Sequence, residues 1–252
     1  MSNKSTEVRN MFSEIARRYD FLNHFLSGNI DRRWRRSCVQ EVSRRLAPGK
    51  ALILDVGCGT GDLSLAFSGI GPVIGCDFCR PMLRIFQEKL ARTAHQNPVS
   101  ILEGDALSLP FPDERFDAVV SAFVLRNLTD AKSGLREMRR VIRHNGVLAV
   151  LDFSMPKTPV IASIYRFYFH HVLPKLGSLI SGVQGPYRYL PDSVQTFPGP
   201  EALKALLAGA GFTNVEHRLF AGGIAVLLLA RAHNSGWEAI RSKKVSKTRQ
   251  IF

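Results

Sequence analysis

Short apolar runs alternate with helix-type segments through most of this chain. Each run stops at glycine, proline or an acidic residue, and the segments between them have apolar positions at helical spacing over roughly ten to fifteen residues. This alternation predicts an α/β fold, a mostly parallel seven-stranded sheet with helices on both faces. The strands are expected at residues 51–56, 72–76, 99–103, 116–122, 146–153, 213–220 and 223–231, and the helices between them at 81–94, 131–142 and 201–210. Asn145 and Gly146 are expected to end the second of these helices.

The part of the chain before the first strand has the period of helices, and we expect a helical leader at residues 1–50. The sheet domain is then expected at 51–231. The apolar faces of two leader helices are formed by Val8, Met11, Phe12, Ile15 and Ala16 in the first, and by Trp34, Cys38, Val42 and Leu46 in the second, at 31–46.

The rhythm of strands and helices breaks between residues 154 and 198. This stretch is rich in aromatic residues, is punctuated by proline, and is too apolar for a disordered loop. We expect an insertion of short helices that covers the ligand edge of the sheet. The basic tail at 232–252 is expected to be loosely ordered.

Charge is concentrated at the two ends of the chain. The formal net charge is +13, of which residues 1–50 carry +6 and residues 231–252 carry +5. A basic periphery around a near-neutral centre suits an anionic partner, either nucleic acid or phospholipid headgroups. A solvated charged face without a specific partner is the alternative.

Composition indicates neither a membrane span nor a secreted disulfide scaffold. No apolar run reaches the roughly eighteen residues that span a bilayer, and the N-terminal residues lack the apolar core of a signal peptide. Four cysteines in 252 residues do not form a disulfide framework, so a cytoplasmic protein is expected. Cys76 and Cys79 have a metal-type spacing, but neither a second pair nor a nearby histidine completes a site, so no metal is expected.

Candidate chemistry gathers after the first expected strand, where the sequence reads Asp55-x-Gly57-x-Gly59-Thr60-Gly61. A strand, a glycine turn and a helix form a small-molecule site at the carboxyl end of the strand. A dinucleotide fingerprint has a third glycine where this chain has Asp62, and an acid there is expected to repel a pyrophosphate. Asp77 ends the next strand, where a carboxylate suits the two hydroxyls of a ribose.

This pattern resembles motif I and the following acidic position of class I S-adenosylmethionine-dependent methyltransferases. The resemblance implies a Rossmann-like class I fold with S-adenosylmethionine as cofactor; an ordinary glycine turn in another Rossmann-like protein is the alternative. By this resemblance, Asp105 accepts from the adenine amino group, the backbone of Ala106 offers an N–H, and Phe78 packs on the adenine face or in the core. The expected cofactor-binding residues are Asp55, Gly57, Gly59, Thr60, Asp77, Asp105 and Ala106.

A second resemblance extends over nearly the whole chain, from about Val8 to Ala230. The residues that carry it are Met11-Phe12-x-x-Ile15-Ala16-x-x-Tyr19-Asp20-x-x-Asn23, Leu26-Ser27-Gly28, Trp34-Arg35, Leu109-Pro110-Phe111-Pro112-Asp113, Leu125-Arg126-Asn127, Tyr187-x-Tyr189-Leu190-Pro191-x-Ser193 and Phe197-Pro198. Together they resemble the ubiquinone/menaquinone biosynthesis C-methyltransferase family. Two positions depart from that family's pattern. Ala122 stands in place of a serine, with Ser121 expected on the opposite face of the strand, and Leu228 stands where a histidine is frequent.

The family resemblance implies methylation of a ring carbon of a prenylated hydroquinone. The ring carbon becomes nucleophilic when a quinol hydroxyl loses its proton, so the enzyme has to orient the reactants and stabilise the developing oxyanion. Arg126 and Asn127 are the expected catalytic residues, Arg126 for the phenolate and Asn127 for the ring oxygen. A helix cap or a structural salt bridge is the alternative for both. Tyr187 and Tyr189 are expected in the quinone pocket or in the core.

The first expected reaction is conversion of demethylmenaquinol to menaquinol in menaquinone (vitamin K2) biosynthesis. The alternatives are methylation of 2-methoxy-6-polyprenyl-1,4-benzoquinol in ubiquinone biosynthesis, or both activities, methylation of RNA or protein, and a non-catalytic subunit of a quinone-biosynthesis complex. Because a polyprenyl tail lies in lipid, we expect a cytoplasmic enzyme peripheral to the inner face of the cell membrane, without a nucleic-acid partner. A homodimer is left open.

Overall fold

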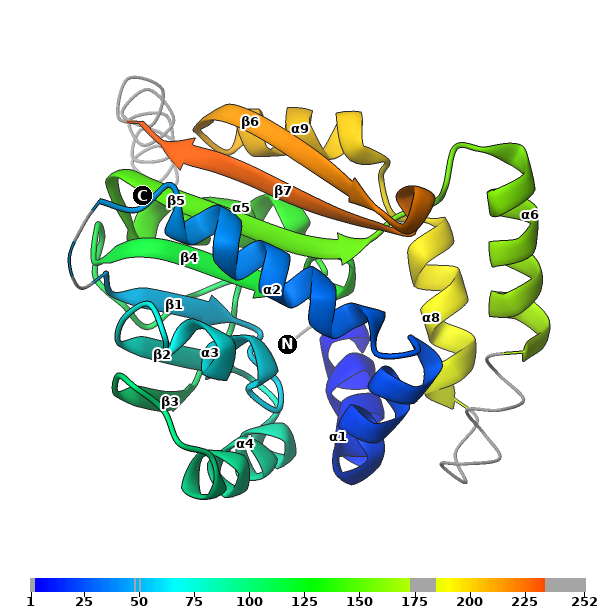
Figure 1. Ribbon diagram of the computed structural model, residues 1–252, viewed down its shortest axis with the longest axis horizontal. Coiled ribbons are helices and arrows are strands. Elements are labelled where there is room, and N and C mark those ends of the chain that lie inside the picture. The colour runs from blue at the N-terminus through cyan, green and yellow to red at the C-terminus, as the bar shows by residue number, and fades with distance from the viewer. Residues whose placement is uncertain (1–2, 48, 50, 173–184, 234–252) are drawn as a thin grey trace, which may run out of the picture.

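A seven-stranded sheet in the order β3-β2-β1-β4-β5-β7-β6 forms the centre of the computed structural model, which describes residues 3–47, 49, 51–172 and 185–233 (Figure 1). The strands are β1 (Ile53–Val56), β2 (Val73–Asp77), β3 (Val99–Glu103), β4 (Phe116–Ala122), β5 (Ile142–Phe153), β6 (Phe212–Phe220) and β7 (Ala225–Ala232). Strands β1 to β5 pair in parallel, whereas β7 runs antiparallel to β5 and to β6. The predicted mostly parallel sheet is therefore confirmed.

Helices cover both faces of this sheet. The helices of the described residues are α1 (Asn3–Leu26), α2 (Ile30–Ser43), α3 (Asp62–Phe67), α4 (Arg80–Arg92), η1 (Leu125–Asn127), α5 (Ala131–Val141), α6 (Pro159–Phe167), η2 (Tyr168–Val172), α8 (Gly185–Gln195), α9 (Pro200–Gly209) and η3 (Ala221–Gly223). Helices α2 and α3 bury their apolar residues on one face, where Trp34 and Phe67 belong to the core. Helices α5 and α9 do the same on the other face, with Met138 and Leu203.

Strand β7 shows why a central strand of this sheet is apolar along most of its length. Its residues alternate between the two cores, with Leu228 on the side of α5 and α9 and Leu227 on the side of α2 and α3. A strand that is covered on both faces buries every residue, so its sequence lacks the polar alternation of a half-exposed strand. The strand expected at residues 223–231 is confirmed at Ala225–Ala232.

The predicted leader forms helices α1 and α2. In α1, Val8, Ile15 and Ala16 are buried and Met11 and Phe12 are half-buried, as their spacing predicted. Helix α1 lies beyond the carboxyl ends of β1 and β4, close to α4 and α8 (Figure 1). The leader therefore contributes to the edge of the sheet where ligands bind in this kind of fold.

Asn145 and Gly146 do not end a helix, which corrects the sequence prediction. Helix α5 ends at Val141, and the chain is already extended at Ile142, where β5 begins. Asn145 has a φ of 59° inside that strand, and the pairing of β4 with β5 shifts register between Phe116 and Ala118. Asparagine tolerates a left-handed backbone, so the pair forms a strand irregularity instead of a helix cap.

The aromatic stretch at 154–198 contains α6, η2 and α8, and residues 173–184 within it lie outside the described part of the chain. Helix α8 stands between α1 and α6 beyond the ends of the strands (Figure 1). The division into leader, sheet domain with insertion, and tail stays a prediction. Residues 234–252 of the predicted tail are not described.

Candidate active site

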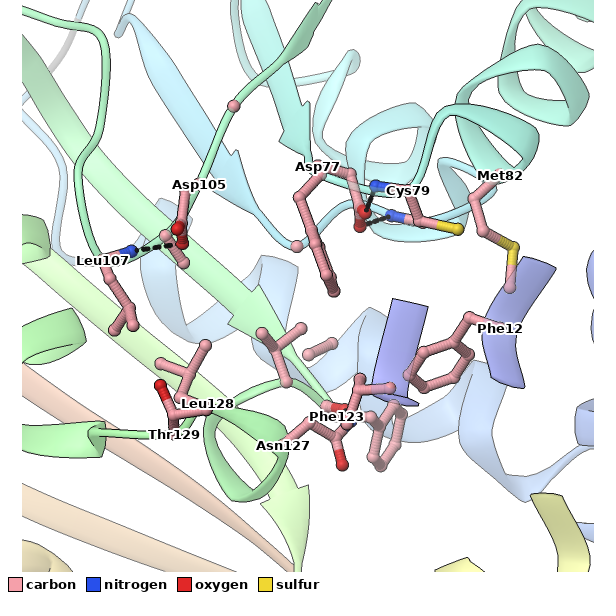
Figure 2. Close-up of a pocket in the computed structure, with 18 residues that line it drawn as sticks. Phe12, Asp77, Cys79, Met82, Asp105, Leu107, Phe123, Asn127, Leu128 and Thr129 are labelled. Atoms are coloured by element: carbon pink, nitrogen blue, oxygen red, sulfur yellow. Dashed lines mark hydrogen bonds between the residues drawn. The ribbon is translucent and has the colours of Figure 1, made fainter. Parts of the chain in front are cut away.

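A pocket opens at the carboxyl ends of β1, β2, β3 and β4 (Figure 2). The empty space among its walls is about 840 Å³, with open solvent at the mouth included. Its lining residues are Val8, Phe12, Gly57, Gly59, Asp77, Phe78, Cys79, Met82, Gly104, Asp105, Ala106, Leu107, Ala122, Phe123, Val124, Asn127, Leu128 and Thr129.

The glycine turn after β1 forms one wall of this pocket. Gly57 has a φ of 70°, and a Cβ built on it would lie 2.4 Å from a methyl carbon of Val124, so no side chain fits there. Gly59 has a φ of 54° and nothing within 4 Å of the position of a Cβ. A side chain at Gly59 would therefore project into free space at the pocket wall, where the glycine leaves room for a ligand to approach the backbone.

Asp77 at the end of β2 is fixed in the pocket wall by backbone donors. Its Oδ2 accepts from the N–H of Gly59 at 2.8 Å and its Oδ1 accepts from the N–H of Cys79 at 2.8 Å (Figure 2). Burial raises the pKa of the Asp77 carboxyl, and the backbone hydrogen bonds oppose this shift. Each oxygen accepts one of these bonds and can still accept another, which fits the two adjacent hydroxyls of a ribose.

Asp105 and Ala106 line the pocket after β3, as predicted. The Oδ1 of Asp105 accepts from the N–H of Leu107 at 2.9 Å, which turns the backbone around the carboxylate. Phe78, for which an adenine contact and a core position were both expected, lies half-buried in the pocket wall. These side chains and the glycine turn suit a nucleoside, so the residues present fit the expected cofactor.

Asp55 is placed behind the glycine turn, outside the pocket lining. Its carboxylate is 1% exposed and accepts from the hydroxyl of Ser64 in α3 at 2.6 Å. Burial raises the pKa of Asp55 to about 7, although the Ser64 hydrogen bond acts in the opposite direction. This residue joins β1 to α3 and supports the turn from behind.

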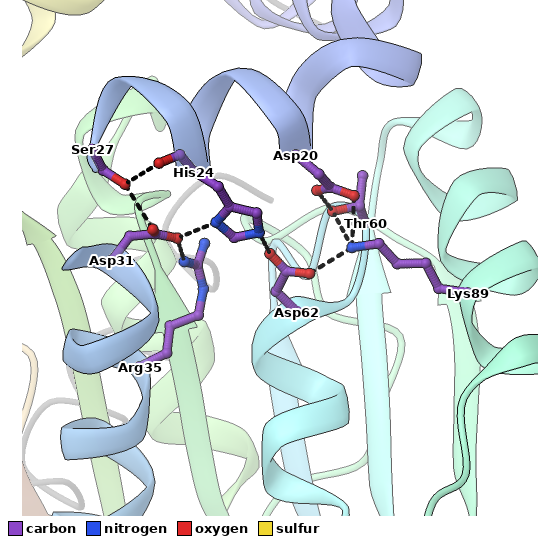
Figure 3. A network of polar contacts seen from close by, with 8 residues as sticks. All are labelled: Asp20, His24, Ser27, Asp31, Arg35, Thr60, Asp62 and Lys89. Carbon is purple, nitrogen blue, oxygen red and sulfur yellow. Dashed lines mark hydrogen bonds and ion pairs between the residues drawn. The ribbon is translucent and has the colours of Figure 1, made fainter. Parts of the chain in front are cut away.

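Thr60 also lies outside the pocket lining, because its hydroxyl is turned to the leader. It donates to Oδ1 of Asp20 in α1 at 2.5 Å, and Nζ of Lys89 lies 2.7 Å from the other Asp20 oxygen (Figure 3). Lys89 also contacts Asp62 at 2.5 Å, and His24 contacts Asp62 at 3.3 Å. The Asp62 charge, expected to repel an anion, is therefore already paired with a cation of α4, and α1 is held against the glycine turn.

Asn127 in η1 is a polar residue at the opposite wall of the pocket (Figure 2). Its Nδ2 donates to the carbonyl of Phe123 at 3.1 Å, and its Oδ1 accepts from the hydroxyl of Tyr189 in α8 at 3.2 Å. Burial raises the pKa of Tyr189, so its hydroxyl stays protonated as a donor. The side chain of Tyr187 lies outside the described residues.

Arg126 does not belong to the pocket lining. Its Nη1 pairs with Oδ1 of Asp152 at the end of β5 at 2.7 Å, and the guanidinium lies over the ring of Phe153 at 5.2 Å. The side chain is 6% exposed, and its Nε is buried without a hydrogen-bond partner among the described residues. The structure thus places Asn127 toward the pocket and Arg126 behind η1 in a buried ion pair.

The sequence prediction missed the apolar side of the pocket. Val8 and Phe12 reach it from α1, and Met82 reaches it from α4. The apolar face of the leader was visible in the sequence, but the surface that it covers was not. Phe123 was also missed; it lines the pocket with a φ of 64° and packs on Phe153 with ring centroids 4.7 Å apart.

The structure shows where Ala122, which departs from the family pattern, and its neighbour Ser121 lie. Ala122 lines the pocket, whereas the hydroxyl of Ser121 donates to the carbonyl of Val56 within the sheet at 2.8 Å, so the two residues face opposite sides as predicted.

Cys76 and Cys79 are buried free thiols, and burial raises the pKa of Cys76 to about 12. Within the described ranges no group of three or more His, Cys, Asp or Glu side chains is arranged to hold a metal.

Comparison with known proteins adds sequence evidence to this geometry. The sequence profile of the ubiE/COQ5 methyltransferase family matches residues 1–231. The chain is 49% identical over 220 residues to a protein from Thermus thermophilus named demethylmenaquinone methyltransferase, covering 86% of this chain and 97% of that one. It is 40% identical over 231 residues to a protein from Geotalea uraniireducens named ubiquinone/menaquinone biosynthesis C-methyltransferase, covering 90% and 97% of the two chains.

Solved structures share the fold at much lower identity. A SAM-dependent methyltransferase from Thermotoga maritima matches with a TM-score of 0.57 and 18% identity, over 88% of this chain and 99% of that chain. One from Aquifex aeolicus matches with a TM-score of 0.55 and 20% identity, over 77% and 89% of the two chains. The predicted Rossmann-like class I fold is therefore confirmed.

Proposed function

Because the chain belongs to the ubiE/COQ5 methyltransferase family, we propose that it methylates a ring carbon of a prenylated hydroquinone. The family, the methyltransferase activity and the cofactor S-adenosylmethionine predicted from the sequence are confirmed. The observation that carries the proposal is that Asp77 and Asn127 line one pocket from opposite walls. Asp77 suits the ribose of a nucleoside, and Asn127 suits an oxygen of a second molecule.

The proposed cofactor residues are those that the pocket brings together. Asp77 would hold the ribose hydroxyls, Asp105 and Ala106 would face the adenine, and the backbone at Gly57 and Gly59 would lie closest to the cofactor. Asp55 and Thr60 are proposed to act from behind, by fixing the turn to α3 and to α1. When bound, S-adenosylmethionine supplies a methyl group on a cationic sulfur, which is an electrophile for a carbon nucleophile.

The chain's own part in the reaction is to orient the quinol and to stabilise its oxygen. Loss of a proton from a quinol hydroxyl makes the ring carbon nucleophilic, and the ring hydrogen leaves as a proton after the new carbon–carbon bond forms. We assign Asn127 as the residue that contacts the ring oxygen, because an amide N–H stabilises a developing oxyanion. Arg126 is assigned a positioning role. Its guanidinium is paired with Asp152 behind η1 and so holds the turn that carries Asn127.

Demethylmenaquinol is the proposed acceptor, converted to menaquinol. The 49% identity to the Thermus thermophilus protein named demethylmenaquinone methyltransferase supports this choice. The second candidate is 2-methoxy-6-polyprenyl-1,4-benzoquinol, since other relatives have names that include both ubiquinone and menaquinone biosynthesis. No observation favours RNA, a protein or a non-catalytic role, so these alternatives are not proposed further.

A peripheral position at the cytoplasmic face of the cell membrane is part of this proposal. The polyprenyl tail of either acceptor would lie in the bilayer, and the enzyme has to meet the ring at the lipid surface. Among the described helices none is long and apolar enough to cross a membrane.

The experiment that tests the acceptor compares the two quinols directly. The purified protein is given labelled S-adenosylmethionine and either reduced demethylmenaquinone or reduced 2-methoxy-6-polyprenyl-1,4-benzoquinone, and the products are identified by mass spectrometry. We expect faster methylation of demethylmenaquinol. Methylation of the benzoquinol alone would overturn the choice of acceptor, and cofactor binding without methylation of either quinol would overturn the proposed function.

Asn127 has its own test in the same assay. Asn127→Ala is expected to lower kcat by roughly a hundredfold, the loss typical of one oxyanion donor. Cofactor affinity, measured by calorimetry, is expected to change little. Ser133→Ala on the exposed start of α5 is the control and should leave kcat unchanged. Full turnover in Asn127→Ala would show that the residue does not stabilise the oxygen.

A further inference from the structure

The outer face of α6 exposes an apolar stripe. Val160, Ile164 and Phe167 are 68%, 65% and 62% exposed, and they are the most exposed large apolar side chains in the described part of the chain. They are separated by four and three residues on one helix, so they lie along a single face. Figure 1 shows α6 at the rim of the molecule, on the side of α8 away from α1.

The opposite face of α6 fixes this orientation. Ala162 and Tyr165 are buried, at 8% and 5% exposed, and Ile161 lies so close to Gly222 that a Cβ added there would be 2.7 Å from its Cδ1. The apolar stripe therefore cannot turn inward without removing Tyr165 from its buried place. A helix that is apolar on both faces has a second surface to cover.

The charged side chains on α6 and in the segment before it are all basic. Lys157 and Arg166 are exposed beside it, and the sequence has no Asp or Glu between residues 153 and 191. His171 stacks on the ring of Phe167 at the end of the stripe, with centroids 5.1 Å apart. Two of the other exposed apolar residues are each followed by an acid, Ile30 by Asp31 and Leu102 by Glu103. A stripe with only basic flanks is complementary to an anionic apolar surface.

We propose that α6 docks on an anionic lipid bilayer, with Val160, Ile164 and Phe167 at the boundary of headgroups and acyl chains and with Lys157 and Arg166 at the headgroups. A second copy of this chain fits the stripe less well. In a two-fold dimer the same patch faces itself, so the basic side chains of both copies would meet. Through the outer face of α6 the enzyme would reach a prenylated acceptor, and this part of the proposal rests on the proposed function. Docking of α6 on lipid does not itself depend on which acceptor is methylated.

Vesicle flotation of the full chain tests the docking surface. Vesicles of phosphatidylcholine with phosphatidylglycerol are compared with vesicles of phosphatidylcholine alone. We expect the wild-type protein to float with the anionic vesicles. The triple variant Val160→Ser/Ile164→Ser/Phe167→Ser should have a partition coefficient lower by roughly tenfold or more, since three apolar side chains no longer enter the lipid.

Matched variants separate the docking surface from general stickiness. Leu102→Ser/Leu219→Ser removes two exposed apolar residues elsewhere and should bind vesicles like the wild type. Lys157→Glu/Arg166→Glu should reduce binding to the anionic vesicles only. Thermal unfolding confirms that each variant is folded. Equal flotation of the triple variant and the wild type would overturn the proposal.

Two further measurements keep the result unambiguous. Sedimentation velocity shows whether the wild type self-associates; a dimer that the triple variant abolishes, with vesicle binding unchanged, would assign the stripe to a second copy and overturn the proposal. Phe167→Trp places a fluorophore in the stripe, and brominated lipids in the anionic vesicles should quench it. No quenching beyond that of the wild-type protein would also overturn it.

Failure of the docking surface and failure of the proposed function have different outcomes. The triple variant should methylate a short-chain quinol in detergent at the wild-type rate, because none of its substitutions lies in the pocket. It should lose activity on a long-chain quinol held in anionic vesicles. Flotation without any quinol methylation would leave the docking surface intact and remove the proposed acceptor.

Discussion

Arg126 donates to both carboxylate oxygens of Asp152, through Nη1 to Oδ1 at 2.7 Å and through its backbone N–H to Oδ2 at 3.2 Å. The side chains are 6% and 0% exposed, so water contributes little to their solvation. The pair fixes η1 to the end of β5, and η1 carries Asn127 to the pocket. The buried charge pair thus has a structural consequence for the site even though neither member lines it.

Asp152→Asn is expected to lower the free energy of unfolding by about 3–5 kcal/mol, because it leaves the Arg126 charge buried without a counter-charge. Urea unfolding measures the loss. Glu103→Gln, which breaks an exposed pair with Arg80, is the control and should cost less than about 1 kcal/mol. The double variant Arg126→Leu/Asp152→Leu should recover much of the stability, and an Asp152→Asn protein as stable as the wild type would contradict the structural role of the pair.

Gly59→Ala is expected to weaken cofactor binding more than it weakens the fold. The methyl group meets nothing within 4 Å in the protein but occupies the pocket wall. Gly28→Ala is a close match, because Gly28 has a φ of 60° and also has nothing within 4 Å, yet lies outside the pocket. Each variant should lose about 1–2 kcal/mol of stability from the left-handed backbone. Calorimetry with S-adenosylmethionine should show weaker binding for Gly59→Ala alone. Equal affinities of the two variants would argue against a close approach of the cofactor to the backbone of Gly59.

Asp55 gives the protein a pH dependence that Asp55→Asn should remove. The folded pKa of about 7 lies above the ordinary value of 3.8, so between these values the folded state holds a proton that the unfolded state has lost. Stability therefore falls as pH rises through this window, by at most about 1.4 kcal/mol per pH unit. Urea unfolding at about pH 5 and about pH 7 should show a steeper decline for the wild type than for the variant. Parallel declines would mean that Asp55 is ionised throughout.

Lys89→Met is expected to loosen α1, because Lys89 bridges Asp20 of α1 and Asp62 beside the glycine turn. Hydrogen exchange of the α1 amides should become several-fold faster, with smaller changes in the sheet. Arg80→Met, at an exposed ion pair at the other end of α4, is the control. If both variants exchanged alike in α1, the bridge would not be what holds the helix.

The strand ends could be predicted from the sequence because parallel strands finish at one edge of a sheet. For this reason Gly59, Asp77, Asp105 and Asn127 share one pocket, although they are spread over the first half of the chain. Their positions follow from periodicity and from the glycine turn. No long-range contact has to be known in advance.

Side-chain direction was the part that the sequence could not provide. Thr60 follows the glycines like a cofactor ligand, but its hydroxyl bonds to Asp20, which is forty positions earlier in the chain. Arg126 and Asn127 are neighbours in sequence, yet one pairs with Asp152 and the other faces the pocket. Such choices depend on which distant group supplies a partner, and local patterns do not contain that information.

Helix α1 is synthesised first, but much of the surface that it covers is synthesised later. It contacts α2, which follows it directly, but also α4 and α8, and the surface of α4 exists only after residues 80–92 have been made. A domain generally folds as a unit, and β1 also needs β4 as its neighbour, so the site cannot form from the first segments alone. The pocket joins Val8 and Phe12 from the start of the chain to Asn127 from its middle, so a chain interrupted before β4 has no complete pocket.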